Sequence, residues 1–562
     1  MKNNLLLILG ILGFQLGIAQ TSNNETVIDQ NSQNSTIEVI QTGENLYARV
    51  TQAGLIEGEQ GNNNQVIIEQ LATSNVVEVT QKGNDNQGIV YFNSTDGIST
   101  VYQEGSNNYA NSDIVASFGI NSSIFQAGNF NTGEFTVSGQ NNIQTTLEQL
   151  GDYNTASINI TTDRFGFTTA LQYQFGNNNT ASVLHSGILR GNSLQRQESI
   201  NGLGNFAIAS LAGQRVALEQ IQLGDENYAE SDQLGIGASD MFSIVTTQSQ
   251  VGNSNYAGSL QNGGDLVVAQ AQIGDNNLVE AYQGTNANNS LIDQSQIGNA
   301  NTSLAEQNVT SEYATNEIIH SQNGNNNEIF SVQMDGENTA SVLQLGNLNS
   351  AQTQQLGTSF SSGEIIIEQN SSGSTLGNTA FAVQNKAFEV FINQTQTGGG
   401  NSMSATQNDV DYVDINQTQI GNENVAMAYQ EAANNFDNEG FSITQNQEGN
   451  TNTAQATQIG GYNNEISQVQ LGNNNDAEAI QNGGFDQNIL SQRQEGHCNV
   501  VTGIQSGENN LLEMIQNGKM NQAQAMQEGQ GNTMMVSQQG EGLQATISQM
   551  GNNSNINVMQ TN

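Results

Sequence analysis

The sequence contains no proline, no tryptophan and a single cysteine, and it has few charged side chains. Charged residues make up 11% of the 562 positions, which is about half the usual share for a globular protein. Because proline cannot donate a backbone hydrogen bond to a β-ladder, its absence over this length favours strand throughout the chain. The lone Cys498 excludes an internal disulfide framework. Stability must therefore come from another source.

Basic residues are scarce as well. The chain has 10 Lys and Arg against 53 Asp and Glu, for a net charge of −43. Nucleic acid and anionic membrane surfaces need a basic patch, so we expect neither as a partner. The acidic residues are scattered along the chain, which is typical of a solvated, mutually repelling surface. They show no recognisable spacing of ligands for a divalent cation.

Long apolar runs are also missing, except near the N-terminus. Lys2 precedes the apolar residues 5–14, which are too few to span a bilayer. Residues 17–19 (Gly-Ile-Ala) resemble a small-residue cleavage site before Gln20. We therefore predict that residues 1–19 are a secretory signal peptide and that the mature protein is exported without insertion into a membrane.

Catalytic constellations are not found in the sequence. His185, His320 and His497 occupy unrelated positions. His497 and Cys498 are adjacent, but neighbouring residues of a strand point to opposite faces, so one cannot activate the other. Neither a P-loop nor a metal-ligand spacing nor a calcium-binding nonapeptide occurs. We expect no enzymatic activity, no cofactor and no metal.

What the sequence does contain is Gly, Asn, Gln, Ser and Thr, arranged in a repeat. Such a composition alone is typical of disorder, but fixed self-similarity indicates a repeat architecture. The motif Gln-x-Gly-x-x-Asn-x-Ala-x-x-x-Gln occurs in full seven times, and partial matches fill most of the gaps. The candidate structural residues belong to the full matches: Gln222, Gly224, Asn227, Gln250, Gly252, Asn255, Gln344, Gly346, Asn349, Gln419, Gly421, Asn424, Gln430, Gln447, Gly449, Asn452, Gln470, Gly472, Asn475, Gln516, Gly518, Asn521 and Gln527.

The spacing within one repeat predicts strands. In residues 424–430 the Asn, Ala, Ala and Gln are two positions apart, so a strand places them on one face, whereas a helix would not keep this period. The preceding arm has a Gln-x-Gln pair, Gln417 and Gln419, with Ile415 in phase two residues earlier. One arm thus offers small inward side chains and the other bulky ones, which allows the two arms to pack closely.

These units predict an all-β fold: a flattened, cross-β solenoid of about 22 strand-arc-strand rungs, each hydrogen-bonded to the next at roughly 4.8 Å. Glycine supplies the positive φ or the close approach that a tight turn needs. A buried amide without a partner costs on the order of 1–3 kcal/mol. Stacked on identical amides, each NH₂ donates to the next C=O. We expect the amides to set the register while the aliphatic residues vary.

The motif resembles the curlin repeat of bacterial curli subunits. The resemblance covers residues 41–562, with degenerate repeats in 41–221 and regular ones in 222–562. It implies a subunit that is secreted through a dedicated outer-membrane pore, assisted by nucleator or chaperone proteins, and that polymerises into extracellular amyloid fibres of biofilms and adhesion. It also implies that residues 20–40 are a polar leader, recognised by the pore and left out of the core.

Alternatives stay open at this point. A monomeric β-solenoid, such as an adhesin or stalk, usually carries polar caps. The last repeat here, Gln549 to Gln560, is followed by no such cap, and uncapped strand edges favour polymerisation. An ice-binding face would need a regular threonine ladder, and the threonines are irregular. Polysaccharide-cleaving β-helices need clustered acids with Arg or Lys in a groove, which the sequence does not indicate.

Overall fold

The computed structural model describes residues 15–19, 23–161, 166–187, 190–235, 243–309, 315–357, 362–432, 440–483 and 487–562. Within these residues the secondary structure is β-strand and contains no helix, and hence no helix that could cross a membrane. The chain divides into two compact units, residues 1–277 and 278–562. Each unit is a β-solenoid of parallel strands, with about 22 coils in the two together, so the predicted fold class is confirmed.

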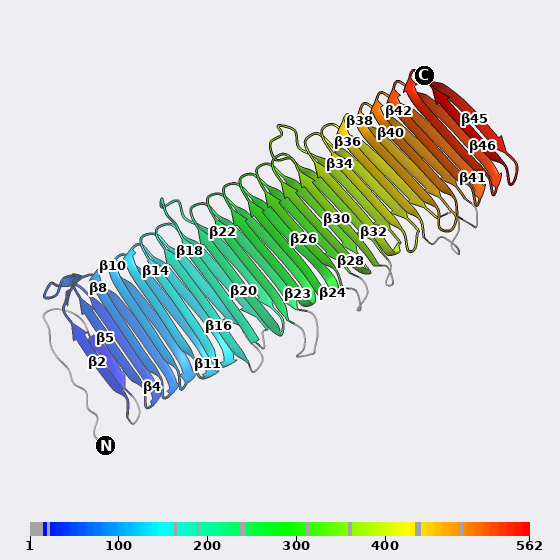
Figure 1. Ribbon diagram of the computed structural model, residues 1–562. Helices are drawn as coiled ribbons and strands as arrows, with labels where there is room; N and C mark the ends of the chain where they lie inside the picture. Colours follow the sequence, from blue (N-terminus) through cyan, green and yellow to red (C-terminus); the bar gives the residue numbers. More distant parts are fainter. Residues whose placement is uncertain are drawn as a thin grey trace. The chain divides into compact units, whose positions relative to one another are not determined.

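In unit 1 the strands alternate between two facing stacks, A and B (Figure 1). Stack A consists of β2 (Glu25–Gln30), β5 (Tyr47–Ala53), β8 (Val76–Asn84), β10 (Ile98–Ser106), β12 (Asn121–Asn129), β14 (Ile143–Leu150), β16 (Phe167–Phe175), β18 (Arg190–Glu198), β20 (Arg215–Leu223) and β22 (Ile244–Val251). Stack B consists of β1 (Gln15–Ala19), β4 (Thr36–Glu44), β7 (Gln65–Thr73), β9 (Gln87–Thr95), β11 (Tyr109–Phe118), β13 (Thr132–Asn141), β15 (Thr155–Thr161), β17 (Thr180–Ser186), β19 (Phe206–Ala212) and β21 (Tyr228–Gly235). The long β23 (Tyr256–Ile273) pairs with β21 through its first half and with β22 through its second, and the short β3 (Ser32–Gln33) pairs with β6 (Gly61–Asn62).

Unit 2 repeats the arrangement. Its stack A consists of the second half of β24 (Leu278–Ile297), β26 (Glu317–Asn323), β28 (Glu337–Leu345), β30 (Ser362–Asn370), β32 (Phe388–Thr397), β34 (Asp414–Ile420), β36 (Ser442–Asn450), β38 (Glu465–Asn473), β40 (Ile489–His497), β42 (Leu511–Lys519), β44 (Thr533–Glu541) and β46 (Asn555–Thr561). Its stack B consists of the first half of β24, β25 (Thr302–Asn308), β27 (Glu328–Met334), β29 (Ser350–Leu356), β31 (Thr379–Asn385), β33 (Ser402–Asn408), β35 (Val425–Glu431), β37 (Thr453–Ile459), β39 (Asp476–Asn482), β41 (Val500–Glu508), β43 (Gln522–Gln530) and β45 (Gln544–Met550).

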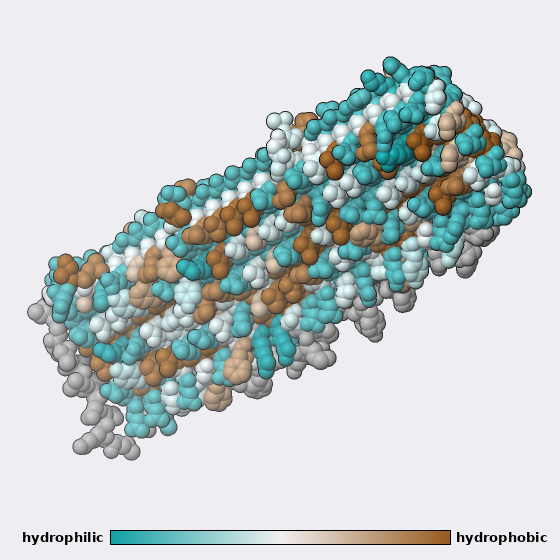
Figure 2. All heavy atoms as spheres, in the orientation of Figure 1, coloured by the Kyte–Doolittle hydropathy of each residue, from teal (hydrophilic) through white to brown (hydrophobic). Residues whose placement is uncertain are grey.

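The core of each unit lies between its two stacks, because burial alternates along the strands. In unit 2, Ile415 and Ile443 of stack A and Ala428 and Ala456 of stack B belong to one buried cluster. The bulky side chains of one stack therefore meet the small ones of the other, and this pairing lets the stacks approach closely. The outward positions mix hydrophilic and hydrophobic residues (Figure 2), as expected for the solvated face of a strand.

Residues 1–19 and 20–40 were expected to be a signal peptide and a leader left out of the core, and the structure contradicts the expectation for part of the leader. The predicted signal peptide lies mostly outside the described residues, and 15–19 form β1. The leader 20–40 was expected outside the core, but where it is described it forms the first coils, and Ile37 and Val39 of β4 are buried. That expectation is wrong for residues 36–40, because the period-two pattern Ile-x-Val supplies inward apolar side chains. No side chain of β2 is fully buried. A role in export stays a prediction.

Candidate functional site

The opening glutamines of the repeats form one continuous column in each unit, which we call ladder A. Each Nε2 donates to the Oε1 of the glutamine in the next coil at 2.7–3.1 Å; Gln222, for example, donates to Gln250 at 2.9 Å, and Gln419 to Gln447 at 2.7 Å. Its members in unit 1 are Gln30, Gln52, Gln81, Gln103, Gln126, Gln149, Gln174, Gln197, Gln222, Gln250 and Gln272, and in unit 2 Gln296, Gln322, Gln344, Gln369, Gln396, Gln419, Gln447, Gln470, Gln494, Gln516, Gln538 and Gln560.

Ladder A also ties the two stacks together. From Gln81 onward, the second hydrogen of the amide reaches a backbone carbonyl of the facing stack: Gln419 Nε2 donates to Ser402 O at 3.1 Å, and Gln250 Nε2 to Tyr228 O at 3.0 Å. Both donor positions of the side chain are thus used, one along the stacking direction and one across the core. A buried amide that would cost 1–3 kcal/mol without partners is fully satisfied here.

The closing glutamines form a second column, ladder B. In unit 2 it is continuous from Gln283 to Gln549 at 2.8–3.1 Å, and Gln430 donates to Gln458 and Gln527 to Gln549 within it. In unit 1 the column begins with Gln41 and Gln70, continues with apolar residues and one histidine, and ends with Gln233 and Gln261. The residues that replace glutamine in the register are Phe92, Ile114, Val137, Ile160, His185 and Leu211.

This replacement explains why the repeats of 41–221 are degenerate as sequence motifs although they stack in the structure. They lose the closing glutamine but keep ladder A, as at Gln103, and the asparagine of the turn, as at Asn108. Ladder A and the asparagine column are therefore retained in coils where apolar side chains fill the column of ladder B.

A third, shorter column contains the first glutamine of each Gln-x-Gln pair; we call it ladder C. It runs from Gln172 to Gln270 in unit 1 and from Gln394 to Gln492 in unit 2. Where it begins, Gln172 Oε1 and Gln394 Oε1 are buried and accept no hydrogen bond. Each ladder thus has a direction: it begins with an acceptor and ends with a donor.

The motif asparagines form a ladder of the opposite direction. Asn424 Nδ2 donates to Oδ1 of Asn401 in the preceding coil at 3.2 Å, and its backbone N–H donates to the same oxygen at 3.1 Å. Its Nδ2 also reaches Gly449 O of the following coil at 2.8 Å. Asn227, Asn255, Asn349, Asn452, Asn475 and Asn521 likewise donate their backbone N–H to the preceding asparagine of the column. Asparagine therefore fixes the turn as well as the register.

The motif glycines lie in the turns between the stacks, where the chain needs both a positive φ and the absence of a Cβ. Gly224, Gly252, Gly346, Gly421, Gly449, Gly472 and Gly518 have φ between +96° and +129°. A Cβ built on Gly449 would lie 1.8 Å from Gly472 O of the next coil, far closer than any real contact. Two residues later the chain adopts left-handed φ again, at Glu423 and Met520 for instance. No sequence signal marks this second position, because it is occupied by Glu, Ser, Leu, Thr, Asn or Met and thus has no consistent residue type.

We expect Gly449→Ala to lower the free energy of unfolding by about 1–3 kcal/mol or more, because the methyl group forces the next coil away and the φ is strained. The matched control is Gly551→Ala, whose φ of +125° is equally strained but whose Cβ would meet nothing within 4 Å. Guanidinium unfolding of the soluble chain followed by tyrosine fluorescence measures both. Equal losses for the two variants would show that φ strain alone, rather than coil-to-coil contact, requires glycine.

The family model of the curlin associated repeat matches residues 507–540. This segment is similar to the curlin associated repeat. It contains Gln516, Gly518, Asn521 and Gln527, so the resemblance inferred from the motif is confirmed for this part of the chain. A comparison with curated proteins found no match.

Two buried histidines occupy columns that hold glutamine in other coils: His185 lies in the column of ladder B and His320 in that of ladder C. His185 Nε2 lies 2.9 Å from Ser193 Oγ, and His320 lies between two serines, with Nδ1 2.8 Å from Ser303 Oγ and Nε2 2.6 Å from Ser331 Oγ. Burial lowers the pKa of His185 to about 4 and that of His320 to about 3. Both imidazoles are therefore uncharged inside the core at neutral pH. The sequence offered no signal for this, because neither histidine lies in a full motif.

The last described coil leaves side chains uncovered. Ala545, Ile547 and Ile556 are only partly buried, although their equivalents in other coils are core residues. Gln549 Nε2, at the end of ladder B, donates no hydrogen bond. The described residues contain no group of His, Cys, Asp and Glu that could hold a metal ion. The uncovered side chains of this coil thus form a surface that is complementary to a coil of the same kind.

Proposed function

We propose that this chain is a structural subunit of extracellular, curli-like amyloid fibres that grow by stacking coil on coil. One observation carries the proposal: the in-register ladders. Every coil presents glutamine acceptors to the preceding coil and glutamine donors to the following one, while its asparagine donates in the opposite direction. A coil of one chain can therefore template a coil of another chain as it does its own neighbour. The uncovered Ile547, Ile556 and Gln549 Nε2 fit a second copy placed on that end.

The proposal extends to the biology that the curlin repeat suggests. The chain is secreted through its N-terminal signal, crosses an outer membrane by a curli-type export pore, and assembles at the cell surface with nucleator or chaperone proteins. Its fibres serve the biofilm matrix and adhesion. Copies of the same chain are its main partner; nucleic acid binding, membrane insertion, enzymatic activity and cofactors have no part in this function.

Fibre formation by the purified full-length mature chain tests the proposal. At tens of micromolar we expect fibres that bind amyloid dyes and give a cross-β reflection near 4.7–4.8 Å, because that is the spacing of stacked strands. Light scattering over several days follows the loss of monomer. A chain that stays monomeric under these conditions would favour a monomeric β-solenoid adhesin or stalk instead.

A further inference from the structure

Two arginines of unit 1 lie side by side on the outward surface of stack A. Arg190 of β18 is directly opposite Arg215 of β20 in the parallel register. Like charges in this arrangement repel each other. Among the described residues neither guanidinium has an ion pair or a hydrogen-bond partner, whereas Arg196, also in β18, pairs with Glu198 and lies over the ring of Phe175. In a chain of 10 basic and 53 acidic residues, two adjacent unpaired cations need an explanation.

The same two arginines line a groove of about 290 Å³. Asn192, Ala217 and Val245, from β18, β20 and β22, line it as well and also line an adjoining groove of about 390 Å³. The two grooves therefore form one continuous depression across the outward surface. Ala217, in the shared part, has the smallest side chain of the lining residues. Its walls are strands held by the ladders below, so the depression is built into the fold.

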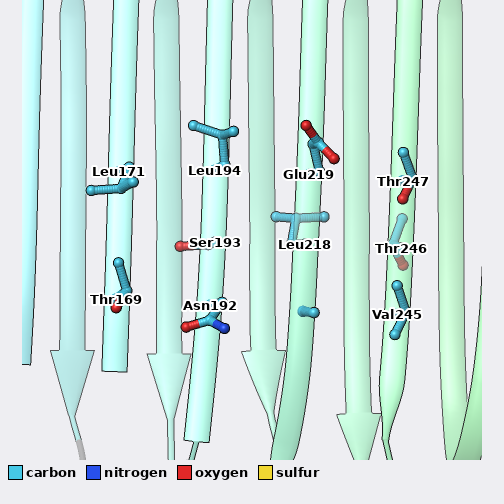
Figure 3. A pocket seen from close by; sticks show the side chains of 11 residues that line it. Thr169, Leu171, Asn192, Ser193, Leu194, Leu218, Glu219, Val245, Thr246 and Thr247 are labelled. Atoms are coloured by element: carbon cyan, nitrogen blue, oxygen red, sulfur yellow. The ribbon is translucent and has the colours of Figure 1, made fainter. Parts of the chain in front are cut away.

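The end of this depression away from the arginines is lined by apolar, hydroxyl and acidic side chains. Figure 3 shows Leu171 and Leu194 in one row with Glu219 and Thr247, next to the row that contains Asn192. Arg215 and Glu219 belong to the same strand, four residues apart, which corresponds to about 13 Å in an extended chain. The groove thus runs from the two adjacent arginines, past the apolar Ala217 and Val245, to the carboxylate of Glu219, which accepts hydrogen bonds.

We propose that this groove binds an acidic sugar, such as one residue or a short run of a polyuronate chain. The planar guanidinium groups of Arg190 and Arg215 match the two oxygens of a carboxylate. Leu194 offers an apolar surface to the face of a sugar ring, and Asn192 can both donate to and accept from hydroxyl groups. Glu219 only accepts, so it fits the hydroxyl hydrogens of a sugar and not a second anion.

The charge distribution favours this ligand over nucleic acid. A polynucleotide carries closely spaced phosphates along its whole length and is bound through extended positive surfaces. Here the cations that line the groove are Arg190 and Arg215 alone, and the acidic Glu219 and Glu198 lie on the same outward surface, where Glu198 pairs with Arg196. A ligand with isolated carboxylates among neutral hydroxyls meets these conditions. The site lies on the outward surface of unit 1 and does not depend on fibre formation.

Binding of polygalacturonate to the full-length chain tests the proposal, with fully methyl-esterified polygalacturonate and single-stranded DNA as comparison probes. We expect polygalacturonate to bind and the double variant Arg190→Gln, Arg215→Gln to weaken it about tenfold or more, since hydrogen bonds to charged groups are among the stronger ones. Arg49→Gln removes the same charge from an outward position of β5 in unit 1, outside the groove, and should change binding less than about twofold.

Ala217→Leu provides an independent variant, because it fills the groove without changing any charge; it should weaken binding as well. Circular dichroism establishes that each variant retains its strand content. Equal binding of the methyl ester, an equal loss in Arg49→Gln, or unchanged binding in Ala217→Leu would each overturn the proposal. Tighter binding of single-stranded DNA that is lost in the double variant would overturn it in favour of nucleic acid.

Discussion

Gln458→Glu is expected to lower the free energy of unfolding by about 3 kcal/mol or more at neutral pH, and to abolish or strongly slow fibre growth. Gln458 Nε2 donates to Gln481 Oε1 at 2.9 Å, and also to Ser442 O and Asn464 O at 3.1 Å. A carboxylate cannot make these donations, and its charge would face the oxygen of Gln481 inside the core. The variant therefore loses a donor and adds a buried, unpaired charge.

The matched control lies on the same strand. Gln455→Glu introduces the same charge in β37, but the side chain of Gln455 is exposed on the outward face. We expect it to change stability by less than about 0.5 kcal/mol. The pH dependence gives a second check: burial raises the pKa of a glutamic acid at position 458, so its cost is largest above that pKa and shrinks as the pH falls and the neutral acid forms.

Guanidinium unfolding of the soluble chain and the lag time of fibre growth measure both variants. If Gln455→Glu and Gln458→Glu have equal effects, the position of the amide within the ladder has no special role. The scattered charge of the chain would then be the quantity that controls stability and assembly, and the account of the ladders would fail.

The second large effect expected is a loss of stability in mild acid, caused by His185 and His320. In the unfolded chain both protonate near pH 6.5, whereas in the folded chain burial holds their pKa values at about 4 and about 3. Below pH 6.5 the unfolded chain thus binds more protons than the folded one. The free energy of unfolding should fall by about 1.4 kcal/mol per pH unit for each histidine, down to the folded pKa, and should not change from this cause above pH 6.5.

His320→Gln separates this effect from the titration of the carboxyl groups. Glutamine restores the residue type that the column holds at Gln294, the preceding position in register, so the fold should persist while the slope between pH 6.5 and 4 decreases by about 1.4 kcal/mol per pH unit. His497→Gln is the control, because His497 is exposed. Unfolding titrations at several pH values give the slopes, and an unchanged slope in His320→Gln would show that another group causes any acid sensitivity.

The sequence predicted the parts of the fold in which one residue type has no substitute. Only an amide can donate and accept in the same column, and only glycine tolerates the contact at Gly449, so the motif identified strands, turns and ladders correctly. Columns that tolerate several residue types could not be predicted. Phe92 and Ile114 occupy the column of ladder B in place of glutamine, and therefore coils that stack in register appeared degenerate as sequence.

Three features of the candidate site could not be predicted from the sequence, because each depends on the backbone or on the register of the strands. The asparagines donate to the preceding coil, because the backbone N–H of Asn424 and its Nδ2 share the Oδ1 of Asn401 as acceptor. A pattern of side chains does not reveal this backbone hydrogen bond. His320 replaces an amide by using serines of the facing stack, a combination visible only once the register is known. The groove at Arg190 and Arg215 required the register too, because the two residues are 25 positions apart in sequence yet directly opposite each other.

An experimental structure of the fibre at side-chain resolution, for example by cryo-electron microscopy of the full-length chain, tests the central claim most directly. The account predicts coils in parallel register with the side-chain amides of Gln430, Gln458 and Gln481 in one inward column, and the column continued by the coil of a neighbouring copy. Fibres in which these three side chains face solvent, or lie out of register with one another, would contradict it.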